Sequence, residues 1–231
     1  MTLRSRLRGT LDTAVFDAGA LGYAMLTRAP RWRSHCAQLA DRAGAKPGHR
    51  VLDLGCGPGI SAFGMLDRVG DLDVVGLDVS RAMLFFAERW RRREPRGGRV
   101  RFVRADATRL PFADKSFDAV TGHSFLYLLP HPERVLAEVH RVLRPGGRCV
   151  FLEPNVDAPD ALLPAEILAH AKDDPRFVMA MALWRGVSRT RGRFDAARFA
   201  SHFGAAGLSV LRCESTLAGL GLYGIGERRP V

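Results

Sequence analysis

The amino-acid sequence predicts an α/β protein in which seven strands form a doubly wound, mostly parallel sheet. Two observations support this prediction. From residue 50 onward, short apolar or β-branched runs alternate with longer segments of helical periodicity, which is the pattern of βαβ units. Directly after the first run, segment 55–59 places three glycines where such a fold turns from a strand into a helix.

The expected elements start with a helical region and then alternate along the chain. Residues 11–43 have the pattern of two helices separated at Ala29-Pro30. Strands are expected at 50–54, 73–77, 100–104, 117–121 and 148–153. Further helices are expected near 60–69, 80–93, 132–143 and 194–206. Two final strands within 208–227, turning near Ala218-Gly219, complete the sheet.

The helix expected over 132–143 illustrates how these elements are recognised. Val135, Val139 and Val142 recur at helical spacing and predict a face that packs on the sheet. Gly146 is expected to end the helix, because glycine tolerates the backbone conformation of a helix stop.

The predicted domain organisation has an N-terminal helical cap, residues 1–45, followed by one binding domain, residues 46–231. An insertion near 156–190 follows the fifth strand and is a candidate lid, because long insertions at this edge of a sheet often cover a site. Its Leu, Met, Phe and Trp residues would line an apolar pocket, touch a membrane or simply fill the core.

Composition limits the classes of protein to be considered. The chain has 231 residues, 47% of them hydrophobic, which is enough for the core of one large domain. Its formal net charge of +11 would suit an anionic partner. Because only three of the 35 basic residues are lysines, a general bias toward arginine explains the charge equally well.

The cysteines and the hydropathy pattern favour a cytoplasmic protein. The four cysteines form no C-x-x-C pair and have no histidine at metal-ligand spacing, so neither a disulfide framework nor a metal site is expected. Asp12 and Asp17 interrupt the apolar residues near the start, and no run approaches the ~18 residues of a membrane span. A soluble protein, peripheral at a membrane at most, is expected.

The glycine loop has an acidic partner on the next predicted strand. Asp78 follows Gly55 by 23 residues, close to the spacing at which a carboxylate meets a ribose diol. Asp53, two residues before Gly55, would repel a pyrophosphate but attract an ammonium group. A ligand with adenosine at one end and an amino acid at the other satisfies both, which describes S-adenosylmethionine. Alternatively, the glycines only make a tight turn.

At this point the chain resembles a known family. The segments VLDLGCGPG, VVGLDVS, RADATRLPF, SFDAV and RVLRPGG are similar, in this order, to the motifs of the class I S-adenosylmethionine-dependent methyltransferases over about residues 45–155. The stretch SFDAVTGHSFLYLLPHPERVLAEVHRVLRPGGRCVFLEP, with Phe16-Asp17 and Tyr23, resembles the quinone-biosynthesis and phospholipid N-methyltransferase group. The resemblance implies a Rossmann-like sheet whose final strand, in GLGLYGIGERRP, is antiparallel.

The resemblance also implies roles for individual residues. Asp53 and the loop residues would meet the methionine moiety of the cofactor, Asp78 the ribose hydroxyls, and Asp106 the adenine amino group. The remaining positions of this cofactor site are Gly55, Cys56, Gly57, Gly59, Val79, Met83, Ala107 and His123. Independently of the family, Asp106 could instead cap the turn that follows it.

Catalytic candidates are His123 and Tyr23, since methyl transfer needs mainly orientation of the two reactants. His123 would act as a general base that titrates near pH ~6.5, or would only hydrogen-bond the cofactor or its own loop. Tyr127 is a further pocket candidate. The oligomeric state is left open.

The expected acceptor is small and apolar or lipid-like, with possible peripheral membrane contact. Residues 121–124 lack the motifs of methyltransferases that act on bases or amides, so a nucleic-acid partner is disfavoured. Two alternatives remain open, an RNA methyltransferase and a non-catalytic protein that binds S-adenosylmethionine.

Overall fold

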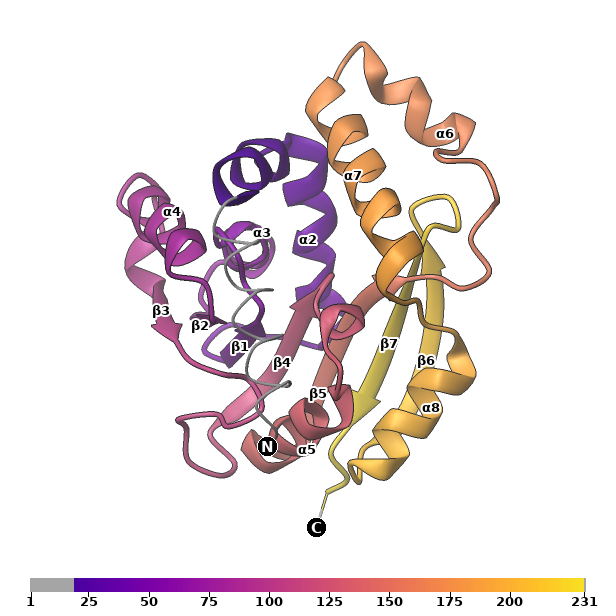
Figure 1. The fold of residues 1–231 in the computed structure, drawn as a ribbon. Helices are drawn as coiled ribbons and strands as arrows, with labels where there is room; N and C mark the ends of the chain where they lie inside the picture. The colour runs from indigo at the N-terminus through magenta and orange to yellow at the C-terminus, as the bar shows by residue number, and fades with distance from the viewer. Residues whose placement is uncertain (1–18, 231) are drawn as a thin grey trace, which may run out of the picture.

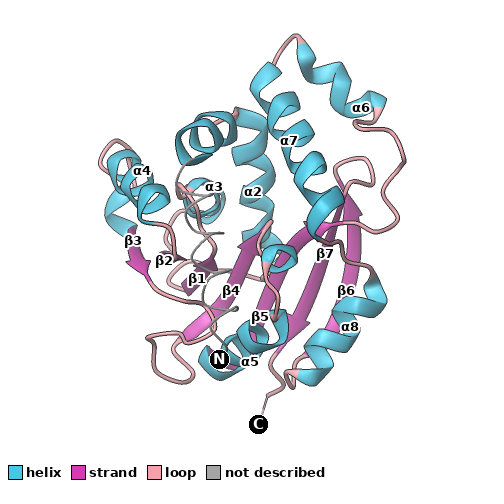
Figure 2. Cartoon of the chain, in the orientation of Figure 1, coloured by secondary structure: helices cyan, strands magenta, loops and turns pink. Residues whose placement is uncertain are grey.

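The computed structural model describes residues 19–230, which form a seven-stranded sheet with helices on both faces (Figures 1 and 2). The strands are β1 (Arg50–Leu54), β2 (Asp73–Asp78), β3 (Val100–Arg104), β4 (Phe117–His123), β5 (Leu143–Pro154), β6 (Ser209–Thr216) and β7 (Gly221–Glu227). Their order is β3-β2-β1-β4-β5-β7-β6. Strands β1 to β5 pair in parallel, and β7 is antiparallel to both β5 and β6. The predicted fold class and the antiparallel final strand are confirmed.

Helices occupy the predicted segments between these strands. Helical residues 19–27 are followed by α2 (Pro30–Arg42), α3 (Ile60–Val69), α4 (Arg81–Arg91), α5 (Pro132–Val142), α6 (Ala165–Leu168), α7 (Pro175–Arg191) and α8 (Ala196–Ala205), with short 3₁₀ turns η1 (Gly97–Arg99), η2 (Leu126–Leu128) and η3 (Ala169–Ala171). The break before Pro30 is where it was predicted, and Ala29 has the extended ψ of 131° that a following proline imposes. Phe16 and Asp17 lie outside the described residues.

The predicted role of Gly146 as the stop of the helix over 132–143 is wrong, although the helix ends within one residue of its predicted end. Helix α5 ends at Val142, and Leu143 already has an extended ψ of 139°. Pro145 disfavours helical backbone in the residue before it, so the chain leaves the helix before it reaches Gly146. Gly146, with φ +78°, instead makes a turn near the start of β5, where its N–H donates to the Arg228 carbonyl at 2.7 Å. Gly146 therefore belongs to a turn within β5 and not to the end of the helix.

Helix α2 packs into the same hydrophobic core as the sheet. Its Trp32, Cys36 and Leu39 side chains are buried within that core. Gly64 on α3 permits a close approach of the two helices, since a Cβ there would lie 2.7 Å from the Arg33 carbonyl oxygen. The N-terminal helical region therefore rests directly on α3, beside the loop that follows β1.

The insertion after β5 divides its apolar residues between core and surface. Phe177, Met181 and Trp184 on α7 are buried, whereas Met179 and Leu183 are exposed. The buried face of α7 packs in the core, and the exposed face leaves contact with a membrane open. No helix in the described part of the chain has both the length and the apolar character needed to cross a bilayer.

Candidate functional site

The glycine loop leaves the carboxyl end of β1 in left-handed backbone. Gly55, Gly57 and Gly59 have φ values of +61°, +50° and +85°. A Cβ would lie 2.3 Å from the Phe125 ring at Gly55 and 2.7 Å from the Phe102 ring at Gly59, so packing requires glycine at both positions. At Gly57 a Cβ would only approach Tyr23 Cε1, at 3.8 Å. Gly57 is buried, and its left-handed φ, more than its packing, favours glycine there.

Asp78 joins this loop to the end of β2. Its Oδ2 accepts the Gly57 N–H at 2.9 Å, and its Oδ1 accepts the Ser80 N–H at 2.8 Å. The register of β1 on β2 pairs Leu54 with Leu77 and brings the two strand ends together. Cys56, also buried, donates its N–H to the Leu77 carbonyl at 3.1 Å. The predicted loop and its acidic partner are therefore neighbours.

Asp53 lies behind the loop rather than on its open side. It is fully buried, its Oδ1 accepts the Thr121 hydroxyl at 2.9 Å, and its Oδ2 accepts the Ser61 hydroxyl. Burial raises the pKa of Asp53 to about 6 against the opposing effect of these hydrogen bonds. With a hydroxyl on each oxygen, the carboxylate links β1, α3 and β4. Its predicted contact with an ammonium group stays a prediction.

The residues predicted around an adenine lie at the ends of β2 and β3. Val79 is exposed, whereas Met83 and Ala107 are buried. Asp106 is exposed, and its Oδ1 accepts the backbone N–H and the hydroxyl of Thr108, both at 2.8 Å. The turn-capping role considered for Asp106 is therefore present. A second role toward an adenine amino group stays a prediction.

His123 ends β4 in a buried aromatic environment. Its Nδ1 is 2.8 Å from the Ser124 hydroxyl, and its ring lies 4.8 Å from the Trp32 ring, centroid to centroid. Its buried Nε2 has no hydrogen-bond partner among the described residues. Burial, with a smaller contribution from the nearby His35, lowers the pKa of His123 to about 3. The imidazole is neutral at physiological pH, which favours the positioning role over a general base that titrates near pH ~6.5.

Two tyrosines complete the site near Gly57. Tyr23 comes from the helical segment 19–27, and Tyr127, from η2, is buried. Burial raises the pKa of both phenols well above the usual value, and the charge that Tyr23 would carry raises that of Tyr127 further. Both phenols are therefore hydrogen-bond donors at neutral pH and not ready bases.

Glu153 is a site residue that sequence reasoning missed. It is fully buried near the end of β5, where its carboxyl oxygens accept the N–H groups of Phe125, Leu126 and Tyr127 at 3.3, 2.9 and 3.1 Å. Burial raises the pKa of Glu153 to about 8, even though these donors oppose the shift. Glu153 thereby fixes η2 and Tyr127. A glutamate within the apolar strand CVFLEP was the available signal.

A buried histidine behind His123 was also missed. The Nε2 atom of His35 lies 3.1 Å from the Tyr223 hydroxyl, and the His35 and His123 rings are 6.1 Å apart. Burial and the nearby Arg42 lower the pKa of His35 to about 4. These side chains come from α2, β4 and β7, so no local sequence motif predicts that they cluster.

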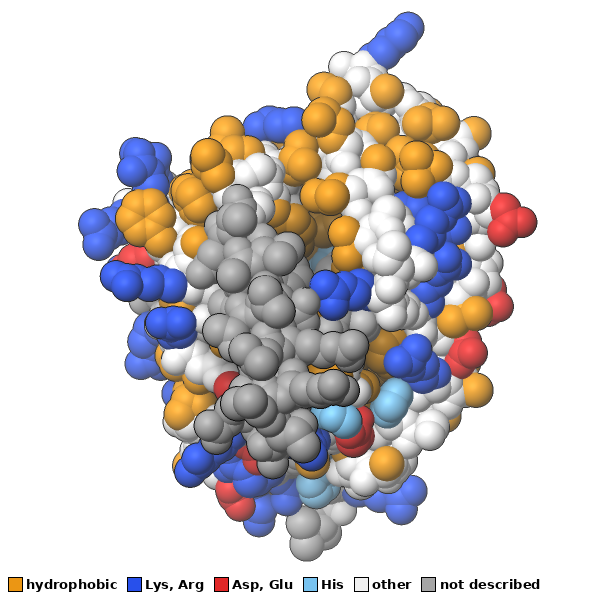
Figure 3. Space-filling view, in the orientation of Figure 1, with side chains coloured by type: hydrophobic (Ala, Val, Ile, Leu, Met, Phe, Trp, Pro, Cys, Tyr) orange, Lys and Arg blue, Asp and Glu red, His pale blue; other side chains and the backbone are white. Residues whose placement is uncertain are grey.

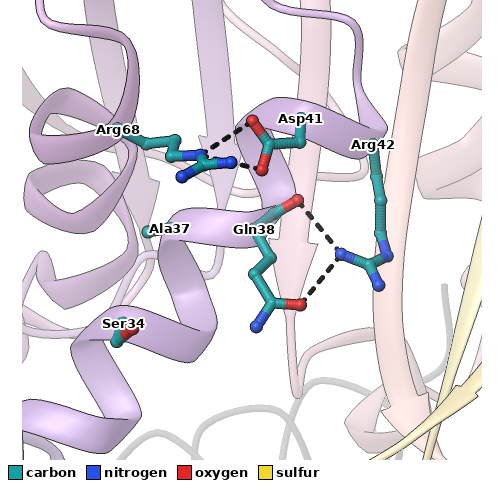
Figure 4. A pocket seen from close by; sticks show the side chains of 6 residues that line it. All are labelled: Ser34, Ala37, Gln38, Asp41, Arg42 and Arg68. Carbon is teal, nitrogen blue, oxygen red and sulfur yellow. Dashed lines mark hydrogen bonds and ion pairs between the residues drawn. The ribbon is translucent and has the colours of Figure 1, made fainter.

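A polar cavity of about 410 Å³ lies away from this site, along α2 (Figure 4). It is lined by Ser34, Ala37, Gln38, Asp41, Arg42 and Arg68. Arg68 pairs with Asp41 at 2.9 Å, and Arg42 donates to the Gln38 side-chain oxygen at 3.0 Å. The polar groups of this cavity therefore satisfy one another, and none of the predicted site residues reaches it.

Comparison with known proteins identifies the core of the chain. Residues 52–151 match the family described as "Methyltransferase domain". This region is a class I S-adenosylmethionine-dependent methyltransferase domain. The match includes the glycine loop, Asp78, Asp106 and His123, which are the positions that the sequence resemblance singled out. S-adenosylmethionine is the cofactor of this class, and the left-handed glycine loop with Asp78 beside it fits such a ligand.

The curated relatives of the methyltransferase domain support the quinone-biosynthesis group. A demethylmenaquinone methyltransferase from Renibacterium salmoninarum is 45% identical over 123 residues, which are 53% of this chain and 47% of that protein. The Thermus thermophilus demethylmenaquinone methyltransferase is 43% identical over 123 residues, which cover 53% and 54%. A sterol 24-C-methyltransferase from Gibberella zeae is 37% identical over 113 residues, covering 49% and 30%. The chain spans about half the length, or less, of these relatives.

Solved structures show that the methyltransferase fold extends over nearly the whole chain. A putative S-adenosylmethionine-dependent methyltransferase from Methanococcus maripaludis has a TM-score of 0.70 at 18% identity and covers 93% of this chain and 94% of its own. The [4+2]-cyclase SpnF has a TM-score of 0.66 at 22% identity, with 87% and 82% covered. Because SpnF is named as a cyclase, the fold alone does not specify the reaction.

Proposed function

We propose that this protein transfers a methyl group from S-adenosylmethionine to a small apolar or lipid-like acceptor. The observation that carries the proposal is the convergence of the Gly57 backbone, Asp78, Tyr23, Tyr127 and His123 at one sheet edge of a methyltransferase domain. Relatives named for demethylmenaquinone and sterol methylation support an apolar acceptor. A cytoplasmic location agrees with this role and is part of the proposal.

The proposed cofactor site follows the edge from β1 to β3. The loop from Gly55 to Gly59 would hold the methionine moiety, and Asp53 would support that loop from behind. Asp78 would accept the ribose hydroxyls. The adenine would lie among Val79, Met83, Asp106 and Ala107. When bound, S-adenosylmethionine supplies an activated methyl group, and the protein orients the acceptor and excludes water.

The proposed acceptor site uses uncharged groups. Tyr23, Tyr127 and His123 are all neutral at physiological pH, because burial disfavours each charged form. They would hydrogen-bond an oxygen of the acceptor while their rings contact its apolar part. Residues 19–42 and α7 would act as cap and lid over this edge, as the sequence predicted.

The two alternative functions have less support. The relatives reported above are named for quinone and sterol methylation, which favours a small apolar acceptor over RNA. A non-catalytic binding protein would keep the cofactor site but show no turnover.

Methyl transfer is tested with labelled S-adenosylmethionine and separate acceptors. We expect calorimetry to show binding of S-adenosylmethionine and its demethylated product, and label to enter a reduced prenylated naphthoquinone but not total RNA. Stronger labelling of RNA would overturn the acceptor class. Cofactor binding with no transfer to any lipid, quinone or small-metabolite extract would support the non-catalytic alternative.

His123 is expected to position its neighbours and not to act as a base. With a pKa of about 3, it stays neutral at all pH values used for assay, so the single-turnover rate should show no imidazole titration between about pH 5.5 and 8.5. His123→Ala should weaken cofactor binding about 3–10-fold and leave the pH profile unchanged. His131→Ala, at an exposed turn, is the control. A rise near pH 6.5 that only His123→Ala abolishes would contradict this role.

A further inference from the structure

Three helices above the catalytic edge expose apolar side chains at helical spacing. Leu21 and Met25 are 59% and 51% exposed on helical segment 19–27, Phe85 is 62% exposed on α4, and Met179 and Leu183 are 57% and 44% exposed on α7. Within segment 19–27 and within α7, the two residues are four apart and share one helix face. Large apolar side chains exposed together on adjacent helices mark an interaction surface.

Specific contacts hold these helices side by side. The Arg28 guanidinium lies 4.7 Å from the ring centroid of Trp90 and connects the end of segment 19–27 to α4. The Arg31 N–H donates to Asp174 Oδ2 at 3.1 Å and connects the start of α2 to the N-cap of α7. In Figure 3, hydrophobic side chains gather across the upper part of this face, with basic side chains at its margins.

Arginines occupy the same helix faces as the apolar residues. Arg81 and Arg89 lie four residues before and after Phe85 on α4, and Arg176 lies three residues before Met179 on α7. All three arginines are exposed, and none has an ion-pair partner among residues 19–230. The acidic residues closest in sequence to these arginines are Glu88, which pairs with Arg91 at 2.6 Å, and Asp174, whose side chain caps α7.

An apolar centre with unpaired arginines at its rim matches the chemistry of an anionic membrane surface. Apolar side chains enter the boundary between headgroups and acyl chains, while arginines remain at the level of the anionic headgroups. A second copy of this chain would bring the same arginines into contact across the interface, which like-charge repulsion disfavours. A nucleic acid would leave the apolar residues exposed.

We propose that segment 19–27, α4 and α7 form a docking face for anionic lipid bilayers. Segment 19–27 connects this face to the site, because Tyr23 approaches Gly57 on its inner side while Leu21 and Met25 point outward. An amphiphilic acceptor could therefore pass from the bilayer to the catalytic edge without crossing water. The docking face rests on exposed residues alone and is independent of the proposed methyl transfer.

Vesicle flotation of the full chain tests this proposal. We expect binding to vesicles of phosphatidylcholine with about three-tenths phosphatidylglycerol, little binding to phosphatidylcholine alone, and weaker binding when the ionic strength rises from about 0.05 to 0.5 M. Replacing both Arg81 and Arg89 with glutamine should weaken binding about fivefold per arginine. Met179→Ser with Leu183→Ser should weaken it about tenfold or more at either salt concentration.

Matched controls separate docking from general effects of charge and apolar area. Leu211→Ser, 43% exposed on the edge strand β6, and Arg134→Gln, exposed on α5, should bind as the unmodified protein does. Thermal unfolding checks that all variants are folded. Equal loss of binding in the controls, no preference for anionic vesicles, or no binding at all would overturn the proposal. The proposal would also be overturned if the only effect of Met179→Ser with Leu183→Ser were to convert a dimer into a monomer.

Discussion

Replacing Glu153 with alanine is expected to lower the free energy of unfolding by about 3–5 kcal/mol. The change removes the common acceptor of the Phe125, Leu126 and Tyr127 N–H groups and leaves a cavity at a fully buried position. Urea unfolding measures this loss. Glu133→Ala, at an exposed position on α5, is the control and should cost less than about 1 kcal/mol. A similar small cost for Glu153→Ala would contradict the proposed support of η2.

The pH dependence of stability gives a second readout for Glu153. Its folded pKa of about 8 lies above the usual glutamate pKa of 4.5, so the folded chain holds this proton more tightly than the unfolded chain does. The free energy of unfolding should therefore fall as pH rises through the folded pKa, by about 2 kcal/mol between pH 6.5 and 8.5. Glu153→Gln should remove this slope. The depressed pKa values of His35 and His123 act in the opposite direction, because the unfolded histidines still bind protons near pH ~6.5, so they affect mainly the lower end of this window.

Replacing Asp78 with alanine is expected to weaken S-adenosylmethionine binding about 10–150-fold. The variant loses the carboxylate proposed to hold the ribose hydroxyls and also releases the Gly57 and Ser80 N–H groups that shape the loop. Calorimetry measures the affinity. An unchanged affinity would remove Asp78 from the cofactor site.

Two further variants indicate how the effect of Asp78→Ala arises. Asp78→Asn keeps an acceptor for one of the two N–H groups and should lose less affinity. Asp114→Ala, at a surface carboxylate paired with Arg141, should bind S-adenosylmethionine as the unmodified protein does. If Asp114→Ala binds S-adenosylmethionine as weakly as Asp78→Ala does, the loss of affinity comes from the change in net charge and not from a specific contact.

Local sequence signals were sufficient to predict the sheet and its loop. Periodicity located all seven strands, Pro30 marked a helix boundary, and the spacing of Gly55 and Asp78 predicted that the two would meet. These features depend on residues that are close in sequence or on the fixed geometry of adjacent parallel strands. The error at Gly146 arose because Pro145 acts first on the backbone.

The surroundings of the buried site residues could not be predicted in the same way. The low pKa of His123 depends on burial against Trp32 and His35, which belong to a helix about ninety residues earlier in the chain. The role of Glu153 depends on three N–H groups that face it only after β4 and β5 have paired. Such contacts follow from tertiary packing, and a single sequence contains no periodic signal for them.

The strand order has a consequence during synthesis on the ribosome. One edge of β5 pairs with β7, which is synthesised more than sixty residues later. The buried residues Cys149–Leu152 therefore remain unpaired on that edge while α8 and β6 are still being translated. Throughout that interval the nascent chain presents an unpaired apolar strand edge, the feature that recruits chaperones and promotes aggregation. Chains arrested before residue 221 should therefore aggregate on release, whereas finished chains, whose β7 closes that edge, should remain in solution.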